Sequence, residues 1–312
     1  MIRFSLLTVA ITWAGAATAD GPKVATDIAP VHSLVSQVME GVGSPDLIIR
    51  PGVSPHGYSM RPSEAQALQS ADLVVWVGEE LAPWMVKPLA SLAQGARQLE
   101  LMDVEGTVHH DFRDLAGHSE ERDGHDDAHH GHDEDEHDHE GVDPHAWLDP
   151  RNAQVWLTRI AEELSDIDPQ NAAIYRDNAT VAHTRLEALE GELSASLVAM
   201  QDVRYISFHD AYQYFEKRFG LEPVGTISLS DASSPGPARL AALRERIAKK
   251  GASCAFSEPQ FDTRLFNAAL GQEAVQIHEL DPLGARLEPG PNLYPALLQS
   301  MADSFAACAK GD

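Results

Sequence analysis

The chain has 312 residues, enough for two domains of roughly 150 residues each, and a hydrophobic content of 43% argues against wholesale disorder. Its formal net charge of −25 argues against nucleic acid or an anionic lipid surface as a partner and favours the attraction of cations.

The N-terminal segment has the layout of a secretory signal peptide. Arg3 supplies a positive charge, residues 4–16 form an apolar run, and Ala17 and Ala19 form a small-x-small cleavage signature. The run is too short and too weakly flanked for a membrane span, and no cysteine follows it that could carry a lipid anchor. We therefore expect cleavage after Ala19 and an exported, soluble mature protein.

Residues 20–167 alternate short apolar runs with amphipathic stretches. Proline opens several of the helical stretches and glycine closes them. This alternation predicts βαβ units in one α/β lobe. The expected strands are 23–28, 46–50, 73–77 and 98–102, and the expected helices are 30–42, one from residue 62, and 81–92.

A tract rich in histidine and acidic residues, 109–143, interrupts this lobe. It holds nine of the fifteen histidines of the chain and has almost no apolar residues, so we expect a mobile loop. Imidazoles interleaved with carboxylates would bind zinc, copper or nickel weakly, although such a run can also be only a solvated linker. The expected auxiliary metal sites are His125, His129, His130, His132, His137 and His139.

Two long helical segments follow, at 151–167 and 171–200. Apolar residues recur at threes and fours in the second, which predicts a helix of up to about 45 Å that can cross a domain boundary. Beyond it the alternation of strands and helices resumes, including helices near 263–270 and 294–309. We therefore expect two α/β lobes with mainly parallel sheets, joined by one linking helix at 168–200, the second lobe covering 201–312.

Three histidines outside the tract are candidate metal ligands. His56, His145 and His209 lie at or just past predicted strand ends or helix starts, where open α/β sheets bind ligands, and Asp281 also follows a predicted strand. A single loop histidine is more often an ordinary surface residue. If the four converge, they form a site in the cleft between the lobes, with donors that suit tetrahedral zinc.

Cys254 and Cys308 are the two cysteines of the chain. In an oxidising compartment such a pair is most simply a disulfide. A pair of zinc thiolates is the alternative, although no second pair or adjacent histidine accompanies them.

Motifs along the whole mature chain resemble the periplasmic zinc-binding components of ABC transporters, the ZnuA type of the metal-specific solute-binding proteins. The matching stretches are 54–63 (SPHGYSMRPS), 73–78 (LVVWVG), 145–150 (HAWLDP), 208–215 (FHDAYQYF), 257–261 (SEPQF), 280–284 (LDPLG) and 308–312 (CAKGD), together with the acidic histidine tract.

This resemblance implies a complete set of functional residues. Zinc would be held by His56, His145 and His209, with water or Asp281 in the fourth position, and Cys254 and Cys308 would form a disulfide. It also implies a periplasmic location and, as partners, a membrane permease with its cytoplasmic ATPase.

The sequence thus predicts a monomeric zinc-binding protein that captures Zn²⁺ for import and is not an enzyme. Two alternatives are a zinc-buffering protein, which depends on the tract alone, and a zinc-dependent hydrolase, which three histidines and an open position would also fit. A hydrolase needs a general base, and Asp210 is the nearest carboxylate in the sequence.

Overall fold

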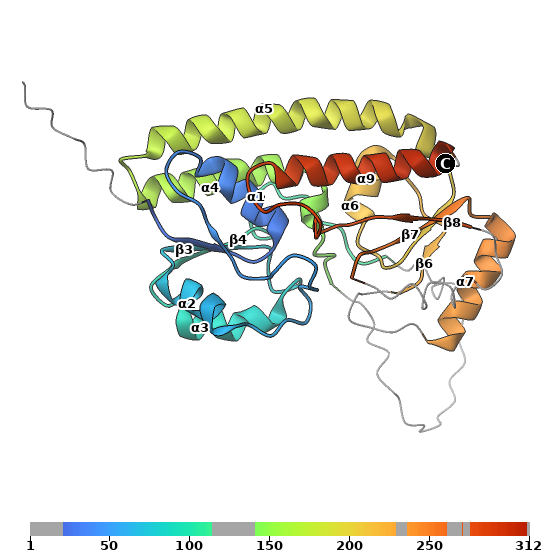
Figure 1. Ribbon diagram of the computed structural model, residues 1–312, viewed down its shortest axis with the longest axis horizontal. Helices are drawn as coiled ribbons and strands as arrows, with labels where there is room; N and C mark the ends of the chain where they lie inside the picture. Colours follow the sequence, from blue (N-terminus) through green and yellow to red (C-terminus); the bar gives the residue numbers. More distant parts are fainter. Residues whose placement is uncertain (1–20, 114–140, 229–235, 261–269, 271–274, 311–312) are drawn as a thin grey trace, which may run out of the picture.

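A computed structural model describes residues 21–113, 141–228, 236–260, 270 and 275–310. It contains two four-stranded sheets, whose strands run parallel within each sheet and whose orders are β2-β1-β3-β4 and β6-β5-β7-β8. Helices cover both sheets, and the two lobes lie side by side beneath a long helix (Figure 1). The expected two-lobe α/β fold is confirmed.

The first sheet is built from short and strongly buried strands. All four residues of β3 are buried, as its unbroken apolar sequence predicts for a strand covered on both faces. The strands are β1 (Val24–Thr26), β2 (Asp46–Leu47), β3 (Leu73–Trp76) and β4 (Arg97–Glu100), and the helices are α1 (Ala29–Val38), α2 (Pro62–Ser70) and α3 (Val86–Leu92).

The helix predicted over 81–92 is shorter in the structure. A 3₁₀ turn, η1 (Pro83–Met85), precedes α3, so the α-helix begins only at Val86. Pro88 has no N–H with which to bond the carbonyl of residue 84, so it is tolerated only in the first turn of an α-helix. The proline therefore fixes how far toward the N-terminus α3 can extend.

The second sheet repeats the strand order of the first. The helix α6 ends at Gly220, whose φ of +70° is the left-handed conformation that glycine adopts readily. The helix predicted at 263–270 lies outside the described residues except for Leu270. The elements are β5 (Tyr205–Ser207), α6 (Gln213–Phe219), β6 (Gly225–Thr226), α7 (Pro237–Lys250), β7 (Cys254–Ser257) and β8 (Gln276–Glu279).

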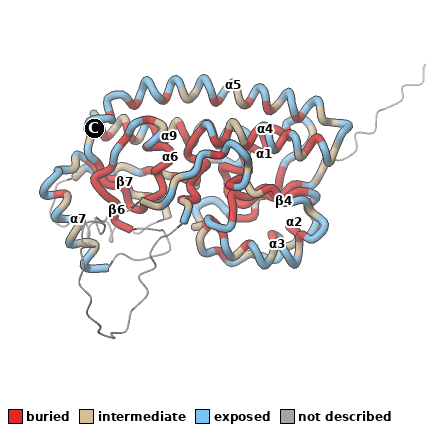
Figure 2. The backbone as a smooth tube through the Cα atoms, turned by 180° about the vertical axis from the view of Figure 1, so that it is seen from behind, coloured by how far each residue is buried: buried red, intermediate tan, exposed pale blue. Residues whose placement is uncertain are grey.

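Three long helices form the layer above the sheets (Figures 1 and 2). They are α4 (Pro150–Ile167), α5 (Ala172–Leu197), which a 3₁₀ turn, η4 (Val198–Met200), extends, and α9 (Leu293–Lys310). The helix α5 buries a narrow apolar stripe and lies over both lobes, as the linking helix was expected to do. No helix in the described part of the chain is long and apolar enough to cross a membrane.

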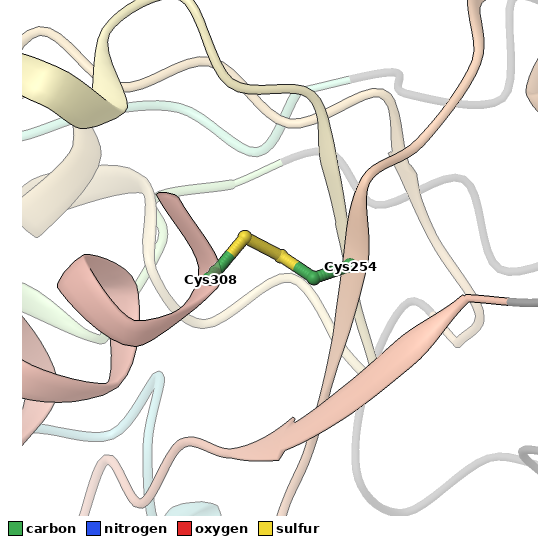
Figure 3. The surroundings of a disulfide bond; sticks show 2 residues. All are labelled: Cys254 and Cys308. Carbon is green, nitrogen blue, oxygen red and sulfur yellow. A yellow bond between two sulfur atoms is a disulfide. The ribbon is translucent and has the colours of Figure 1, made fainter. Parts of the chain in front are cut away.

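The C-terminal helix α9 also spans the molecule. It packs against α5, against α1 of the first lobe and against β8 of the second. Near its start, the Tyr294 hydroxyl donates to the Trp147 carbonyl, and near its end a disulfide joins Cys308 to Cys254 of β7, with 5.9 Å between the Cα atoms (Figure 3). Two helices, rather than one, therefore connect the lobes, and the disulfide excludes the thiolate-zinc alternative.

Candidate metal-binding site

The three candidate histidines line one small pocket where the lobes meet. The ring centroids of His56 and His145 are 5.6 Å apart, and those of His145 and His209 are 5.3 Å apart. The pocket has a volume of about 10 Å³, which is room for roughly one water molecule or one ion. The pocket is lined by Pro55, His56, His145, Trp147, His209, Gln260, Pro282 and Leu283.

His56 is presented by the loop between β2 and α2. The indole N–H of Trp84 donates to the Pro55 carbonyl at 2.8 Å, and the His56 N–H donates to the Ser54 hydroxyl at 3.3 Å. On the far side of the loop, the Glu64 carboxylate accepts from the backbone N–H of Arg61 and caps α2. Contacts on both sides of the loop therefore restrain His56.

His145 is buried and is oriented by Asp143. Its Nδ1 lies 2.7 Å from Oδ1 of Asp143, and the same oxygen accepts the His145 backbone N–H at 3.0 Å. Burial by itself would raise the pKa of the Asp143 carboxyl, but the charge and hydrogen bonds of His145 lower it below its usual range. Because Nδ1 faces the carboxylate, Nε2 is the nitrogen available to a metal.

His209 is oriented in the same way by a carboxylate from another strand. It follows β5, and its Nδ1 lies 2.5 Å from Oε1 of Glu258, whose side chain is fully buried just after β7. Sequence reasoning missed both carboxylates as functional residues. The closeness of Asp143 to His145 in the chain could have indicated the first, but only the parallel pairing of β5 with β7 brings Glu258 to His209.

Asp281, the fourth candidate, is placed differently. Its carboxylate oxygens accept three backbone N–H groups, those of Leu283, Gly284 and Ala285, at 2.6–3.1 Å. Burial raises the pKa of this carboxyl. The residues that follow it, Pro282 and Leu283, line the pocket, whereas Asp281 is not among the lining residues.

The other histidines that the structure describes do not line this pocket. His32 lies in α1 with Nε2 3.1 Å from the Pro45 carbonyl, and burial lowers its pKa. His183 lies in α5 and His278 in β8. The tract histidines at 125, 129, 130, 132, 137 and 139 lie outside the described residues.

Asp210 is held by an arginine. The Arg113 guanidinium donates to Oδ1 of Asp210 at 2.6 Å and to Oε2 of Glu216 at 2.5 Å, and both carboxylates are almost fully buried. A general base must reach the proton that it abstracts, and this carboxylate is already bound to a permanent cation. The geometry therefore gives no support to the hydrolase alternative.

Residues 108–113 and 141–143, which include the two described ends of the tract, form a short antiparallel stem. Asp111 pairs with Val142, and the stem lies against α6 of the second lobe. The Gln213 amide donates to the Asp111 carbonyl at 3.1 Å and to Oδ2 of Asp143 at 3.0 Å. The tract thus begins and ends beside the pocket, and the second lobe helps to fix the carboxylate behind His145.

The histidine pocket is not yet a closed cage. Among the residues that the structure describes, no three His, Cys, Asp or Glu side chains already stand as they would around an ion. An ion held by all three imidazoles would therefore need these side chains to move closer together. Three neutral imidazoles are nonetheless a donor set that suits zinc, and the pocket has room for one ion.

A larger groove, with a volume of about 760 Å³, lies between β4 and α4. Among its lining residues are the acidic side chains of Glu100, Asp103, Glu105 and Glu162. No histidine lines it, so donor chemistry rather than size identifies the candidate site.

Two α/β lobes with parallel sheets, bridged by helices and with a pocket where they meet, define the class of two-lobe solute-binding proteins. Solved structures described as "Crystal structure of ZnuA" and as the solute-binding protein FpvC from Pseudomonas aeruginosa with Mn²⁺ share this fold. Their TM-scores are 0.75 and 0.76, each at 21% identity, and the alignments cover 93% of this chain and 99% and 98% of those chains.

The chain belongs to the family described as zinc-uptake complex component A, periplasmic, whose model matches residues 24–308. The high-affinity zinc uptake system protein ZnuA of Paracoccus denitrificans (strain Pd 1222) is 46% identical to it, with full coverage of both chains. The protein of the same name from Brucella abortus (strain 2308) is 41% identical over 91% of each. The family consists of zinc-uptake components, so the expectation of a binding protein rather than an enzyme is confirmed.

Proposed function

We propose that this protein captures Zn²⁺ in the periplasm and delivers it to an ABC permease for import. The observation that carries the proposal is the convergence of His56, His145 and His209 on one pocket. These residues come from three separated segments and from both lobes, so their meeting is not a result of local sequence. Three imidazoles and an open fourth position form a zinc site from which the ion can leave.

The charges around the pocket support this proposal. A Zn²⁺ bound by three neutral imidazoles brings two positive charges into a poorly solvated space. The carboxylates of Asp143 and Glu258 lie directly behind two of the rings and can balance that charge while holding each ring by Nδ1. The fourth position is then open to water, because the oxygens of Asp281 already accept three backbone N–H groups.

Metal selectivity follows from the donor atoms. The Paracoccus and Brucella relatives are named as zinc uptake proteins, whereas structures with the same fold are described with Mn²⁺ or Ni²⁺. Imidazole nitrogen suits zinc, and manganese prefers carboxylate and other oxygen donors. The three histidines therefore favour zinc in this chain.

Partners and location complete the proposal. The family name places the protein in the periplasm as a component of a zinc-uptake complex. We infer that residues 1–19 are removed as a signal peptide after Ala19 and that the mature protein acts as a monomer. It would deliver zinc to a membrane permease that is driven by a cytoplasmic ATPase.

Replacing the pocket histidines one at a time tests the assignment. His56→Ala, His145→Ala and His209→Ala should each weaken zinc binding at least tenfold, because water must then replace an imidazole. His183→Ala, which changes a histidine of α5 outside the pocket, is the matched control and should bind like the parent. Competition with a zinc chelator measures the affinities. Equal affinity of all four variants would refute the site.

A further inference from the structure

Gln260 also lines the pocket, and the three-histidine site gives no role to its side-chain amide. Its Nε2 donates to Oε2 of Glu258 at 2.7 Å. A carboxylate can only accept, so the nitrogen must face Glu258, and this fixes the orientation of the amide. The opposite atom, Oε1, is buried and has no hydrogen-bond partner among the described residues.

A buried acceptor without a donor is costly, by about 1–3 kcal/mol, and native proteins rarely keep one without a reason. The position of this acceptor suggests the reason. No other side chain among the lining residues, which are otherwise prolines, histidines, a tryptophan and a leucine, carries an oxygen atom. The Trp147 indole N–H cannot serve as the donor, because it already donates to the Pro282 carbonyl at 2.8 Å.

On the basis of the zinc-binding function proposed above, we propose that Gln260 Oε1 accepts a hydrogen bond from the water that fills the fourth coordination position of the bound metal. Water bound to a divalent cation is a stronger donor than bulk water, since the ion withdraws electron density from its oxygen. Gln260 thereby becomes a specificity-determining residue, and its two polar ends connect this water to the carboxylate behind His209.

The neutral amide has a consequence for metal choice. An amide oxygen adds no charge and keeps the fourth position for water, so nitrogen donors dominate the site. A carboxylate at residue 260 could ligate the metal directly and would offer the oxygen donor that manganese prefers. Gln260→Glu, which preserves the size of the side chain, should therefore narrow the preference for zinc over manganese by tenfold or more.

The experiment uses the full mature chain with Co²⁺ as a spectroscopic substitute for zinc. Gln260→Met removes both polar ends of the side chain. It should lower zinc affinity by roughly ten- to a hundredfold, as loss of supporting hydrogen bonds at metal sites does, and it should change the visible spectrum of the Co²⁺ form. Gln37→Met, which alters a buried glutamine of α1 that bonds the Ser33 carbonyl, is the control and should change neither.

The outcomes separate this inference from the proposed function. A Gln260→Met protein with a parental cobalt spectrum, even at lower affinity, would overturn the inference, because the residue would then act only by supporting Glu258. An unchanged zinc-to-manganese ratio in Gln260→Glu would also overturn it, and this variant remains decisive if the methionine variant fails to fold. Failure of the parent protein to bind either metal would instead refute the proposed function.

Discussion

Asp27 has a fully buried carboxyl group at the end of β1, and it does not line the histidine pocket. Its two oxygens each accept a backbone N–H at 2.7 Å, one from Ile28 and one from Val77 just after β3. Burial raises the pKa of Asp27 to about 7, and the hydrogen bonds from the backbone offset only part of that effect. The carboxyl ties two neighbouring strands together and titrates near neutral pH.

This shift makes the stability of the metal-free protein depend on pH. The folded state holds the proton more tightly than the unfolded chain, whose aspartate titrates near 3.8, so the contribution of Asp27 is complete below about pH 4 and is lost as the pH rises through about 7. We expect the free energy of unfolding to fall by up to a few kcal/mol from pH 5 to pH 8. Asp27→Asn, which cannot titrate, should remove this part of the decline.

Urea unfolding at several pH values measures the effect, with the metal chelated throughout. Asp202→Asn changes an exposed aspartate and should reproduce the parental pH profile. If the Asp27→Asn profile declines in parallel with the parent, another group is responsible for the pH dependence.

The candidate ligands themselves could be found from the sequence, and their supporting residues could not. His56, His145 and His209 each lie at a predicted strand end or helix start, which is where α/β folds bind ligands. Glu258 and Gln260 follow β7, but nothing in the sequence pattern of that strand shows which side chain turns toward a histidine 49 residues earlier. That information depends on strand order and register, which the sequence pattern leaves open.

At the scale of elements, the contact between the stem and α6 is one of the polar connections between the lobes. Arg113 from the stem bonds Asp210 and Glu216, and Arg218 near the end of α6 makes two hydrogen bonds to Asp149, the residue that caps α4. These charges are mostly buried, so removing one partner leaves a charge that neither water nor protein satisfies.

Arg113→Ala should therefore destabilise the protein by about 3 kcal/mol, because Glu216 and Asp210 lose their cation while Tyr205 still donates to Glu216. Arg159→Ala is the matched control. That arginine pairs with Glu162 and Glu163 on the exposed face of α4, where an ion pair contributes about 0–1 kcal/mol. Urea unfolding of both variants gives the comparison, and an equal loss of stability would show that the stem does not connect the lobes.

The elements show a second limit of sequence reasoning. The linking helix was predictable, since apolar residues recur at helical spacing along α5. The helix is therefore long enough to cross from one lobe to the other. The contacts of α9 with both lobes were not predictable, because its amphipathic pattern shows that one face is buried but not which elements cover that face. Its contacts with α1, α5 and β8 depend on the return of the chain from the second lobe to the first.

At the scale of the whole molecule, we expect the negative charge of the protein and the histidine tract both to attract the zinc ion. A net charge of −25 attracts divalent cations from solution, and the stem places both ends of the tract beside the pocket. Residues 114–140 of the tract lie outside the described residues, so binding of metal by the tract remains a prediction from sequence. Metal held there would stay at high effective concentration near the pocket.

Deleting residues 117–140 tests whether the pocket binds the tight zinc ion and the tract binds the weaker ones. Phe112 and Gly141 are bonded across the stem, so residues 113–116 would remain as a connection of ordinary hairpin length, and the fold should survive. Binding within the tract must order a chain that has no core of its own, so its sites should be weaker than the pocket, whose carboxylates already hold two of the rings.

Calorimetry on the deleted protein should consequently show one tight zinc per molecule and no weaker equivalents, and zinc uptake in cells should suffer most when zinc is scarce. Adding His145→Ala to the deletion is the control and should remove the remaining tight equivalent. Loss of the tight zinc from the deletion alone would mean that the tract contains the principal site and that the three-histidine pocket does not.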